Sequence, residues 1–547
     1  MTNKEIAKTF QFLGQIMELH GENKFKIRSY QNAYMTLRKL DQPLSEMSDE
    51  AISGIKGVGK AIAGKIRELV DKGEMATLER YKSQTPEGVQ EMLGIKGFGP
   101  KKISTIWKDL GVESIGELLY AVNENRLIEL KGFGKKTQDD LKEKLEYYQK
   151  SKNKYHYAAV AEIATNFWTQ LKTALPKGGV HPTGATRRKA IIQDQIDLVV
   201  SAPESDVLSA LNLLGATIEK TTSVYIKGQT AQEIPFFIYL CTPDKFGTCL
   251  FQTTGTADFL AALPSLQGTA YANEKVVFKA LDLPYILPEL REQAWAVELA
   301  QQDALPELIE VQHIKGVVHA HSTYSDGLHT LREMASYCKA QGFEYLGITD
   351  HSKSAFYANG LQVERVLQQH QEIDQLNAEL APFRIFKGIE SDILSDGSLD
   401  YEEDILASFD FIIASIHSNL RMDEAKATHR LITAIENPYT NMLGHPTGRL
   451  LLSRKGYPID HKAVIDACAA NSVAIELNAN PYRLDLDWSW IPYALEKGVL
   501  ISINPDAHSM EGVHHIRWGV AAARKGGLSA QHCLNAQGTE AFAKWCG

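Results

Sequence analysis

The sequence predicts a multidomain chain whose N-terminal part is α-helical and whose last third is a barrel of parallel strands and helices. Three observations predict it. The chain has 547 residues, enough for about three or four domains. A short glycine motif repeats three times within the first 150 residues. In the last third, seven short apolar segments follow one another, as buried parallel strands do.

The repeated motif is a short apolar entry, then Gly-apolar-Gly, then a helix-forming stretch often rich in lysine. It reads GIKGVGKAIAGKI from Gly54, GIKGFGPKKISTI from Gly94 and LKGFGKKTQDDL from Leu130. Glycine allows a tight turn and close approach to a ligand, and the first N–H groups of the following helix can bind a phosphate. The motif resembles the helix-hairpin-helix, which grips the DNA backbone without reading sequence. Three glycine turns between ordinary helices are the alternative. The glycines predicted to contact DNA are Gly57, Gly59, Gly97, Gly99, Gly132 and Gly134.

The opening segment NKEIAKTFQFLGQIMELHGENKFKIRSYQNAY carries apolar residues at helical spacing. It resembles the small N-terminal domain of family X DNA polymerases, which in some members holds a Schiff-base lysine that removes sugar remnants from DNA ends. The matching position is Lys65, and a solvated helix lysine is the alternative, because a nucleophilic amine needs a depressed pKa. We expect a helical domain with the first hairpin over residues 1–85 and further, fingers-like hairpins over 86–150.

Residues 155–300 continue the resemblance to family X polymerases. HPTGATRRKAIIQDQIDLVVSA is similar to the family's G-S-x-R-R…D-x-D element, and FFIYLCTPDKFGTCLFQTTGT to its third-carboxylate strand and T-G-S turn. LDLPYILPELRE is similar to the end of its thumb. The resemblance implies an α/β nucleotidyltransferase-like palm over 151–240 and a thumb-like region over 241–305. It places the nucleotide site at Gly184, Arg187 and Arg188.

The predicted palm lacks two of the family's three carboxylates. Nucleotidyl transfer by two metals needs about three carboxylates around ions roughly 3.5–4 Å apart. By the family spacing these positions fall on Gln195, Asp197 and Phe237, so only Asp197 can bind a metal. Asp194 would replace the first acid only through a shift of strand register or a bulge. We therefore expect an inactive, degenerate palm without a functional Mg²⁺ site.

The seven apolar segments read VVHAH, YLGITDH, IFKGIE, FIIASIH, NMLGH, AIELN and ISINPDAH. Chemistry in α/β barrels lies at the carboxyl ends of the strands, so polar residues that end these segments are expected to meet. AIELN ends in Asn478 and supplies no obvious ligand. A single histidine at a strand end is more often structural, but that does not explain nine ligand-type residues together. The nine predicted metal ligands are His319, His321, Asp326, His351, Glu390, His417, His445, Asp506 and His508.

Residues 312–547 carry six short motifs, which in order are GVVHAHSTYSDGLHT, GITDHS, KGIESDI, ASIHSN, GHPTGRLL and NPDAHS. In this order they resemble the motifs of the PHP (polymerase and histidinol phosphatase) family. The resemblance implies a distorted (βα)7 barrel with three divalent metals. Mixed imidazole and carboxylate ligands suit Mn²⁺, Fe²⁺ or Zn²⁺ better than Ca²⁺, and the resemblance implies Mn²⁺ among these. Clustered ions of this kind promote phosphoester hydrolysis. The implied sites are His319, His321, Glu390 and Asp506; Asp326, His351 and His508; and a bridging Glu390 with His417 and His445.

Charge and composition point to DNA and to a reduced compartment. Residues 1–150 hold 25 Lys and Arg against 22 Asp and Glu, whereas the rest hold 33 against 45. The N-terminal part is therefore the better candidate for DNA contact. The six cysteines form no CxxC pair, no apolar run reaches the ~18 residues of a membrane span, and the first residues lack a signal-peptide pattern. We expect a cytoplasmic protein without membrane contact, and a monomer.

The combined prediction is a DNA-repair protein that acts on gapped, nicked or 3′-ended DNA without sequence specificity. The resemblance implies a metal-dependent 3′-to-5′ exonuclease or phosphoesterase in the C-terminal domain that serves base-excision repair, with 3′-phosphatase or abasic-site cleavage as related activities. The first alternative is an active gap-filling DNA polymerase with an associated exonuclease, against which Gln195 and Phe237 argue. The second is a non-catalytic DNA-end scaffold, against which the nine predicted ligands argue.

Overall fold

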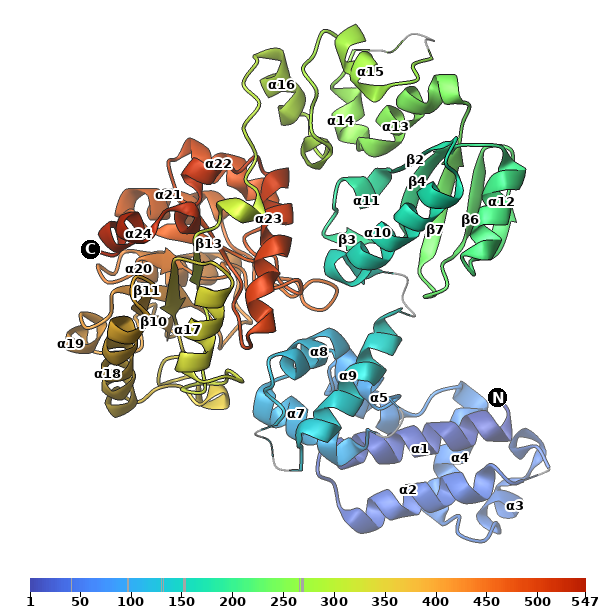
Figure 1. Cartoon of the computed structure of the whole chain (residues 1–547). Coiled ribbons are helices and arrows are strands. Elements are labelled where there is room, and N and C mark those ends of the chain that lie inside the picture. Colours follow the sequence, from blue (N-terminus) through green and yellow to red (C-terminus); the bar gives the residue numbers. More distant parts are fainter. Residues whose placement is uncertain are drawn as a thin grey trace. The chain divides into compact units, whose positions relative to one another are not determined.

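The structure is a computed structural model. It describes all residues except 41, 96–97, 129, 131, 151–153, 265 and 267–269, and it does not describe the side chains of 147–150. Of the glycines predicted to contact DNA, Gly97 lies outside the described residues. The chain divides into two compact units, Met1–Glu146 and Tyr147–Gly547 (Figure 1).

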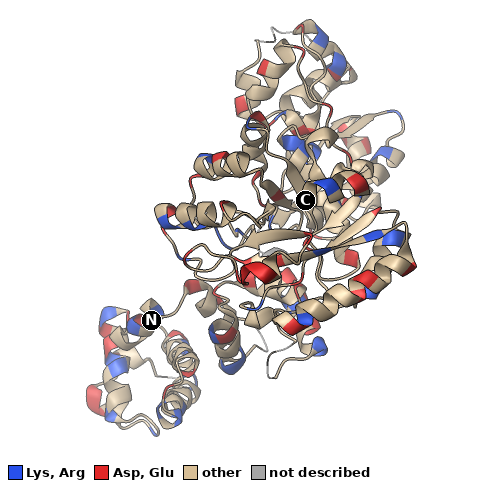
Figure 2. Cartoon of the chain, turned by 90° about the vertical axis from the view of Figure 1, so that its left-hand side faces the viewer, with Lys and Arg blue, Asp and Glu red and all other residues tan. Residues whose placement is uncertain are grey.

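The first unit is built of helices, as predicted. Helix α1 (Asn3–Leu19) begins at the capping side chain of Thr2 and buries its apolar face. The ring of Phe10 stacks on Tyr30 of α2 (Lys24–Leu37), with centroids 6.0 Å apart. The other helices are α3 (Asp49–Ser53), α4 (Lys60–Lys72), α5 (Ala76–Ser83), α6 (Glu87–Met92), α7 (Pro100–Leu110), α8 (Ile115–Asn123) and α9 (Lys135–Lys150). Figure 2 shows Lys and Arg on the helices near the N-terminus together with Asp and Glu.

The second unit begins with a five-stranded mixed sheet in the order β2-β4-β7-β6-β5, in which only β4 and β7 are parallel. Helices α10 and α12 pack on one face against Ile226, Phe236 and Ile238. The strands are β2 (Gly179–Pro182), β4 (Ile196–Ser201), β5 (Thr217–Thr221), β6 (Tyr225–Gln229) and β7 (Pro235–Leu240), and β1 (Tyr155–His156) pairs separately with β3 (Ile192–Gln193). The helices are α10 (Tyr157–Ala174), α11 (Gly184–Arg187) and α12 (Glu204–Leu213).

A small helical region follows the mixed sheet and has a core of its own. Phe251, Phe259 and Phe278 lie at the centre of this core. Its helices are α13 (Phe246–Thr254), α14 (Ala257–Ala261), α15 (Glu274–Ala280) and α16 (Trp295–Gln301).

The rest of the second unit is a nearly closed barrel of seven parallel strands in the order β14-β13-β12-β11-β10-β9-β8. A parallel bridge between Ala320 and Ala507 joins the two ends of this sheet. The strands are β8 (Gly316–Val318), β9 (Tyr345–Ile348), β10 (Arg384–Asp392), β11 (Phe411–Ser415), β12 (Met442–Leu443), β13 (Ala474–Asn478) and β14 (Ile501–Asn504). The helices are α17 (Leu331–Ala340), α18 (Val363–Leu380), α19 (Glu403–Leu406), α20 (Glu424–Ile435), α21 (His461–Asn471), α22 (Ile491–Glu496), α23 (Ile516–Lys525) and α24 (Thr539–Cys546).

The two ends of the barrel have different chemistry. At the amino ends of the strands, Phe542 of α24 packs against Tyr345, Phe386 and Phe411, with ring centroids 4.7, 4.9 and 5.7 Å away. This apolar plug leaves the carboxyl ends as the place for polar side chains. The architecture confirms the predicted fold class. Among the described residues, no helix is both long and apolar enough to cross a membrane.

Candidate metal centre

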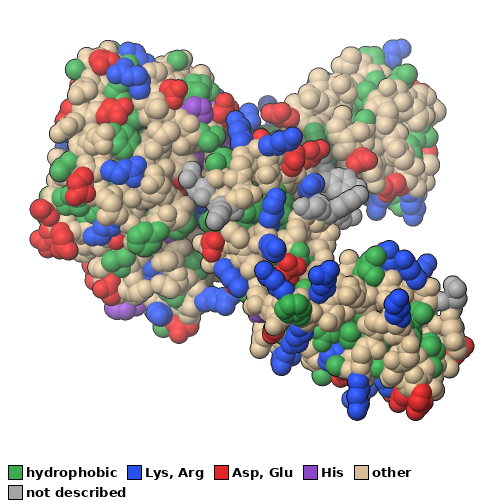
Figure 3. All heavy atoms as spheres, turned by 90° about the horizontal axis from the view of Figure 1, so that it is seen from below, with side chains coloured by type: hydrophobic (Ala, Val, Ile, Leu, Met, Phe, Trp, Pro, Cys, Tyr) green, Lys and Arg blue, Asp and Glu red, His purple; other side chains and the backbone are tan. Residues whose placement is uncertain are grey.

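The nine predicted metal ligands meet at the carboxyl end of the barrel. They lie on or shortly after β8, β9, β10, β11, β12 and β14, and none of their side chains is more than 8% exposed. Accordingly, histidine takes up little of the surface seen in Figure 3. His319 and Asp506 have positive φ angles of 69° and 50°. Such backbone strain in non-glycine residues persists only where the surroundings enforce it, and it gathers at functional sites.

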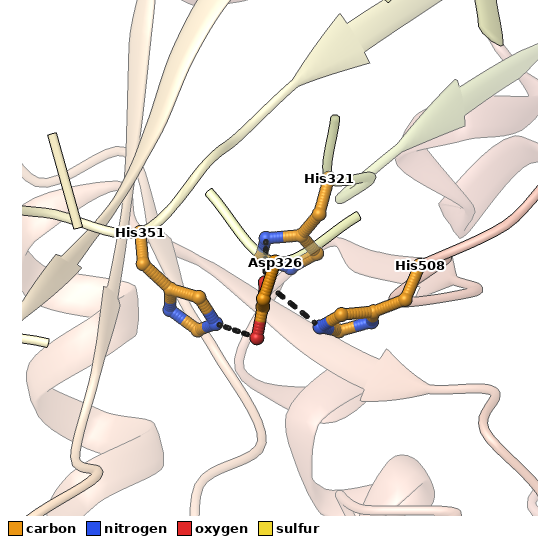
Figure 4. A group of neighbouring side chains, drawn as sticks. All are labelled: His321, Asp326, His351 and His508. Atoms are coloured by element: carbon orange, nitrogen blue, oxygen red, sulfur yellow. Dashed lines mark ion pairs between the residues drawn. The ribbon is translucent and has the colours of Figure 1, made fainter. Parts of the chain in front are cut away.

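One group consists of His321, Asp326, His351 and His508 (Figure 4). Asp326 lies at its centre, with Oδ2 3.6 Å from His351 Nε2 and Oδ1 3.4 Å from His508 Nε2. His321 Nδ1 lies 3.9 Å from the same Oδ1. One carboxylate therefore faces three imidazoles, at separations longer than direct hydrogen bonds.

A second group surrounds Glu390, in the middle of the barrel mouth. Its Oε1 lies 3.0 Å from Nε2 of both His417 and His445, and its Oε2 lies 2.9 Å from His351 Nδ1. His319 Nε2 is 3.4 Å from Oε2. His321 Nε2 lies 3.8 Å from the same oxygen, so Glu390 faces five imidazoles.

A third group consists of His319, His321 and Asp506. Asp506 Oδ1 is 3.4 Å from His319 Nε2 and 3.1 Å from His321 Nε2. Three histidines stand between groups. His319 faces both Glu390 and Asp506, His321 faces Asp326 as well as Asp506, and His351 faces both Asp326 and Glu390. The resemblance had assigned His321 and His351 each to a single site.

Several nitrogen and oxygen atoms of the cluster that could bind a metal are buried and have no hydrogen-bond partner among the described residues. They are His319 Nε2, His321 Nδ1, Asp326 Oδ2, both ring nitrogens of His351, Glu390 Oε2 and His445 Nδ1. A buried polar atom without a partner costs free energy, so its presence calls for an explanation. Divalent cations would satisfy these lone pairs, and the mixed nitrogen and oxygen donors suit Mn²⁺, Fe²⁺ or Zn²⁺. The residues present therefore fit a multinuclear metal centre.

The electrostatics of the cluster keep its carboxylates ionised and two of its imidazoles neutral. Burial raises the pKa of a carboxyl group, but the surrounding histidines outweigh it and hold the pKa of Glu390 and of Asp506 well below the usual range. Burial lowers the pKa of His321 to about 4 and also lowers that of His445, so both rings are neutral at pH 7. Burial would lower the pKa of His319 too, but Glu476, Asp506 and Glu390 raise it well above its ordinary value.

Two acids missed by the sequence reasoning hold two of the predicted ligand histidines in place. His319 Nδ1 donates to Glu476 Oε2 at 2.5 Å, and His417 Nδ1 donates to Asp392 Oδ1 at 2.5 Å. Each bond directs the other ring nitrogen, Nε2, toward Glu390. Both acids carried a signal in the sequence. Glu476 lies two residues before Asn478, and Asp392 two residues after Glu390, so each shares a strand face with a residue at the barrel mouth.

The palm positions also lie together. Asp197 of β4 pairs in register with Phe237 of β7, and Gln195 Nε2 donates to Asp197 Oδ1 at 2.8 Å. Burial raises the pKa of Asp197 to about 6. The side chain of Asp194 is 69% exposed and lies 4.0 Å from Lys154, whereas Gln195 is hydrogen-bonded to Asp197. Gly184 is held close to this acid, because a Cβ there would lie 2.5 Å from Asp197 Oδ2.

The two palm arginines are engaged within the protein. Arg187 Nη1 and Nη2 donate to the two carboxylate oxygens of Glu274 at 2.6 and 2.7 Å. Arg188 Nη1 donates to the carbonyl of Thr254 at 2.6 Å, and its Nε lies 3.1 Å from Glu292. The guanidinium groups predicted to hold a nucleotide are thus bound to α13, to α15 and to the segment after it.

The glycine motifs of the first unit form tight turns before helices. Gly57 and Gly132 have φ angles of 88° and 90°, which glycine adopts without strain. Gly59 and Gly99 are the N-caps of α4 and α7, and Gly134 precedes α9. Among the described residues, no atom lies within 4 Å of a Cβ built at Gly59, Gly99 or Gly134, so these helix starts are open.

Lys65, the candidate Schiff-base lysine, lies on α4 and is partly buried. Its Nζ donates to Thr77 Oγ1 at 2.6 Å.

Comparisons with known proteins agree with this arrangement. A helix-hairpin-helix domain model matches residues 1–75, a SAM-like helix-hairpin-helix tandem matches 89–146, and a PHP domain matches 318–480. The DNA polymerase/3′-5′ exonuclease PolX of Bacillus subtilis is 35% identical over the whole of both chains. A probable phosphatase of Thermoanaerobacter is 27% identical over 40% of this chain and 88% of its own length. One from Caldicellulosiruptor saccharolyticus is 32% identical over 35% and 78%, respectively.

The helix-hairpin-helix domains indicate DNA binding, and the PHP domain indicates a metal-dependent phosphoesterase or nuclease type of activity. Full-length similarity to one relative joins these parts in the same order. The chain therefore belongs to the bacterial PolX family, the family X DNA polymerases that carry a C-terminal PHP domain.

Proposed function

We propose that the barrel over residues 312–547 removes nucleotides or blocking groups from the 3′ ends of DNA during base-excision repair, and that the palm no longer synthesises DNA. The nine buried ligand-type side chains at the barrel mouth, several with unpartnered donor atoms, carry this proposal. The proposed ligands are His319, His321, Asp326, His351, Glu390, His417, His445, Asp506 and His508.

The protein's own groups prepare this centre for phosphoester hydrolysis. Glu390 faces five imidazoles with one carboxylate, and Glu476 and Asp392 fix two of those rings through Nδ1. Bound divalent ions, for which we propose Mn²⁺ with Zn²⁺ or Fe²⁺ as alternatives, would polarise a phosphoryl oxygen and lower the pKa of a water molecule. Metal analysis of the purified protein identifies them.

The palm lacks the means for nucleotidyl transfer. Three carboxylates are required for two ions, and here Gln195 and Phe237 leave Asp197 alone. Arg187, which would face a nucleotide, is bound to Glu274 through both Nη1 and Nη2. We propose that residues 151–305 position DNA rather than extend it.

One paired assay separates the possible functions. A gapped duplex with a labelled primer is incubated with Mn²⁺ and all four dNTPs. We expect the primer to shorten, and a variant with His319→Ala and His321→Ala should not shorten it. Extension of the primer would instead establish an active polymerase, the activity that the name of the Bacillus relative gives for that protein. No change in primer length would establish a non-catalytic scaffold.

Replacing Glu476 with Gln should weaken metal binding by about 10–100-fold, the usual effect of losing an outer partner of a ligand histidine. The Glu476 carboxylate accepts hydrogen bonds from His319 Nδ1, from the backbone N–H of His445 and from Asn504 Nδ2. Titration calorimetry with Mn²⁺ measures the change, and excess Mn²⁺ should restore most of the hydrolysis. Unchanged Mn²⁺ affinity would show that Glu476 does not position His319.

A further inference from the structure

The palm sheet has one face that the helices α10 and α12 do not cover. Side chains alternate between the two faces of a strand. Ile226 of β6 and Ile238 of β7 point into the helix-covered core and are fully buried. Their neighbours along the strands therefore point to the opposite face. Five side chains from three strands mark this face, and we call them the aromatic–lysine platform: Lys220, Tyr225, Lys227, Phe237 and Tyr239.

The three rings of the platform contact one another across the strands. Phe237 stacks on Tyr225, with centroids 5.0 Å apart and an interplanar angle of 23°, and lies 4.5 Å from Tyr239. Tyr225 pairs in register with Tyr239, and Phe237 with Lys227. All three rings are partly exposed. Cross-strand packing fixes them in position and leaves part of their surface open to solvent.

Two lysines border these rings. Lys227 Nζ lies 5.3 Å from the centroid of Phe237 and 5.9 Å from that of Tyr225. Lys220 Nζ lies 5.8 Å from the Tyr225 ring. Both lysines are exposed. The platform thus presents flat apolar surface next to positive charge that reaches into water.

The carboxylate of Asp197 lies on this face next to the platform, and it is buried and hydrogen-bonded. Asp197 lies beside Phe237 in the parallel pair β4–β7, is 8% exposed, and accepts a hydrogen bond from Gln195. Three clustered carboxylates would repel a phosphate backbone unless cations were bound between them. Because Gln195 and Phe237 are neutral, this face can accept a polyanion without metal ions.

We propose that the aromatic–lysine platform binds an unpaired segment of single-stranded DNA, with bases stacked on Phe237 and its neighbouring tyrosines and phosphates near Lys220 and Lys227. Stacked bases beside a basic track are the common way of holding single strands without sequence preference. The site functions without metal, so it is independent of hydrolysis in the barrel.

The test compares DNA with and without bases. Full-length protein in EDTA is titrated into fluorescein-labelled oligo-dT of about a dozen nucleotides, and into an abasic oligonucleotide of the same length. Fluorescence anisotropy reports the Kd. Wild type should prefer oligo-dT. Phe237→Ala should weaken oligo-dT binding by roughly 5-fold or more while leaving the abasic oligonucleotide unaffected.

Matched variants separate stacking from other effects. Phe237→Trp should retain the preference for bases, whereas Lys227→Ala should weaken both oligonucleotides about equally. Leu213→Ala is the surface control, since Leu213 is 84% exposed on α12. Because EDTA removes divalent ions, the binding measured in this experiment does not depend on hydrolysis in the barrel. Equal losses on both oligonucleotides for a folded Phe237→Ala protein, or no loss on either, would overturn the proposal.

Discussion

Changing Glu390 to Gln should reduce Mn²⁺-dependent shortening of DNA 3′ ends by more than roughly 100-fold, the upper range for losing a group that only supports a ligand. The substitution keeps the size of the side chain but removes its negative charge. Glu390 faces five imidazoles, at 2.9 Å from His351, 3.0 Å from His417 and His445, 3.4 Å from His319 and 3.8 Å from His321. A neutral amide there would leave the nitrogen ligands without the carboxylate that joins their groups.

Shortening of a labelled 3′ end and the metal content of the purified variant are measured together. Glu379→Gln is the matched control, because Glu379 is 51% exposed and pairs only at the surface with Arg332. The control should retain full activity and metal. If Glu390→Gln kept both its metal and its hydrolysis, this carboxylate would not be part of the centre.

The nine ligand-type residues could be found from sequence because parallel strands place their carboxyl ends at one edge. An apolar run ending in His or Asp is then enough to put His351, His417 and Asp506 in one place. Glu476 escaped the same reasoning because it lies inside its strand and its direction depends on the strand's rotation in the barrel. The segment AIELN was judged by its last residue, Asn478, whereas Glu476 bonds to His319. Because side chains alternate along a strand, Glu476 lies on the same face as Asn478, and this alternation predicts that Glu476 also points to the barrel mouth.

The palm shows a similar division. The family spacing after the Arg187-Arg188 pair placed Gln195 and Asp197 at the first two acid positions, and the spacing back from Phe246-Gly247 placed Phe237 at the third. The register of β4 with β7 sets Asp197 beside Phe237. The partners of the arginines could not be predicted. Glu274 is 87 residues beyond Arg187, and their contact depends on how α15 packs on the palm. Long-range pairs of this kind leave no periodic pattern in the sequence.

The buried charges around Glu274 should make it one of the most sensitive positions for stability. Glu274 is 6% exposed and pairs with Arg187 and with Arg291, each at 2.6 Å, and Arg291 is fully buried. Changing Glu274 to Gln leaves two buried guanidinium groups without their counter-charge. Loss of one partner of a buried ion pair typically costs about 3–5 kcal/mol. We expect a clearly lower urea midpoint at pH 7, measured by tryptophan fluorescence, whereas the exposed pair of Glu379 should contribute about 1 kcal/mol or less.

The ion pairs of Glu274 also determine how the stability of the protein depends on pH. Burial raises the pKa of Glu274, but Arg187 and Arg291 outweigh it and lower the pKa from its ordinary 4.5 to about 2. Because the folded-state pKa lies below the unfolded one, the stabilisation is complete above pH 4.5 and is lost as the pH falls toward 2. The wild type and Glu274→Gln should therefore differ most at neutral pH and converge in acid. A constant difference between them across this range would mean that the Gln variant is destabilised by altered packing rather than by the missing charge.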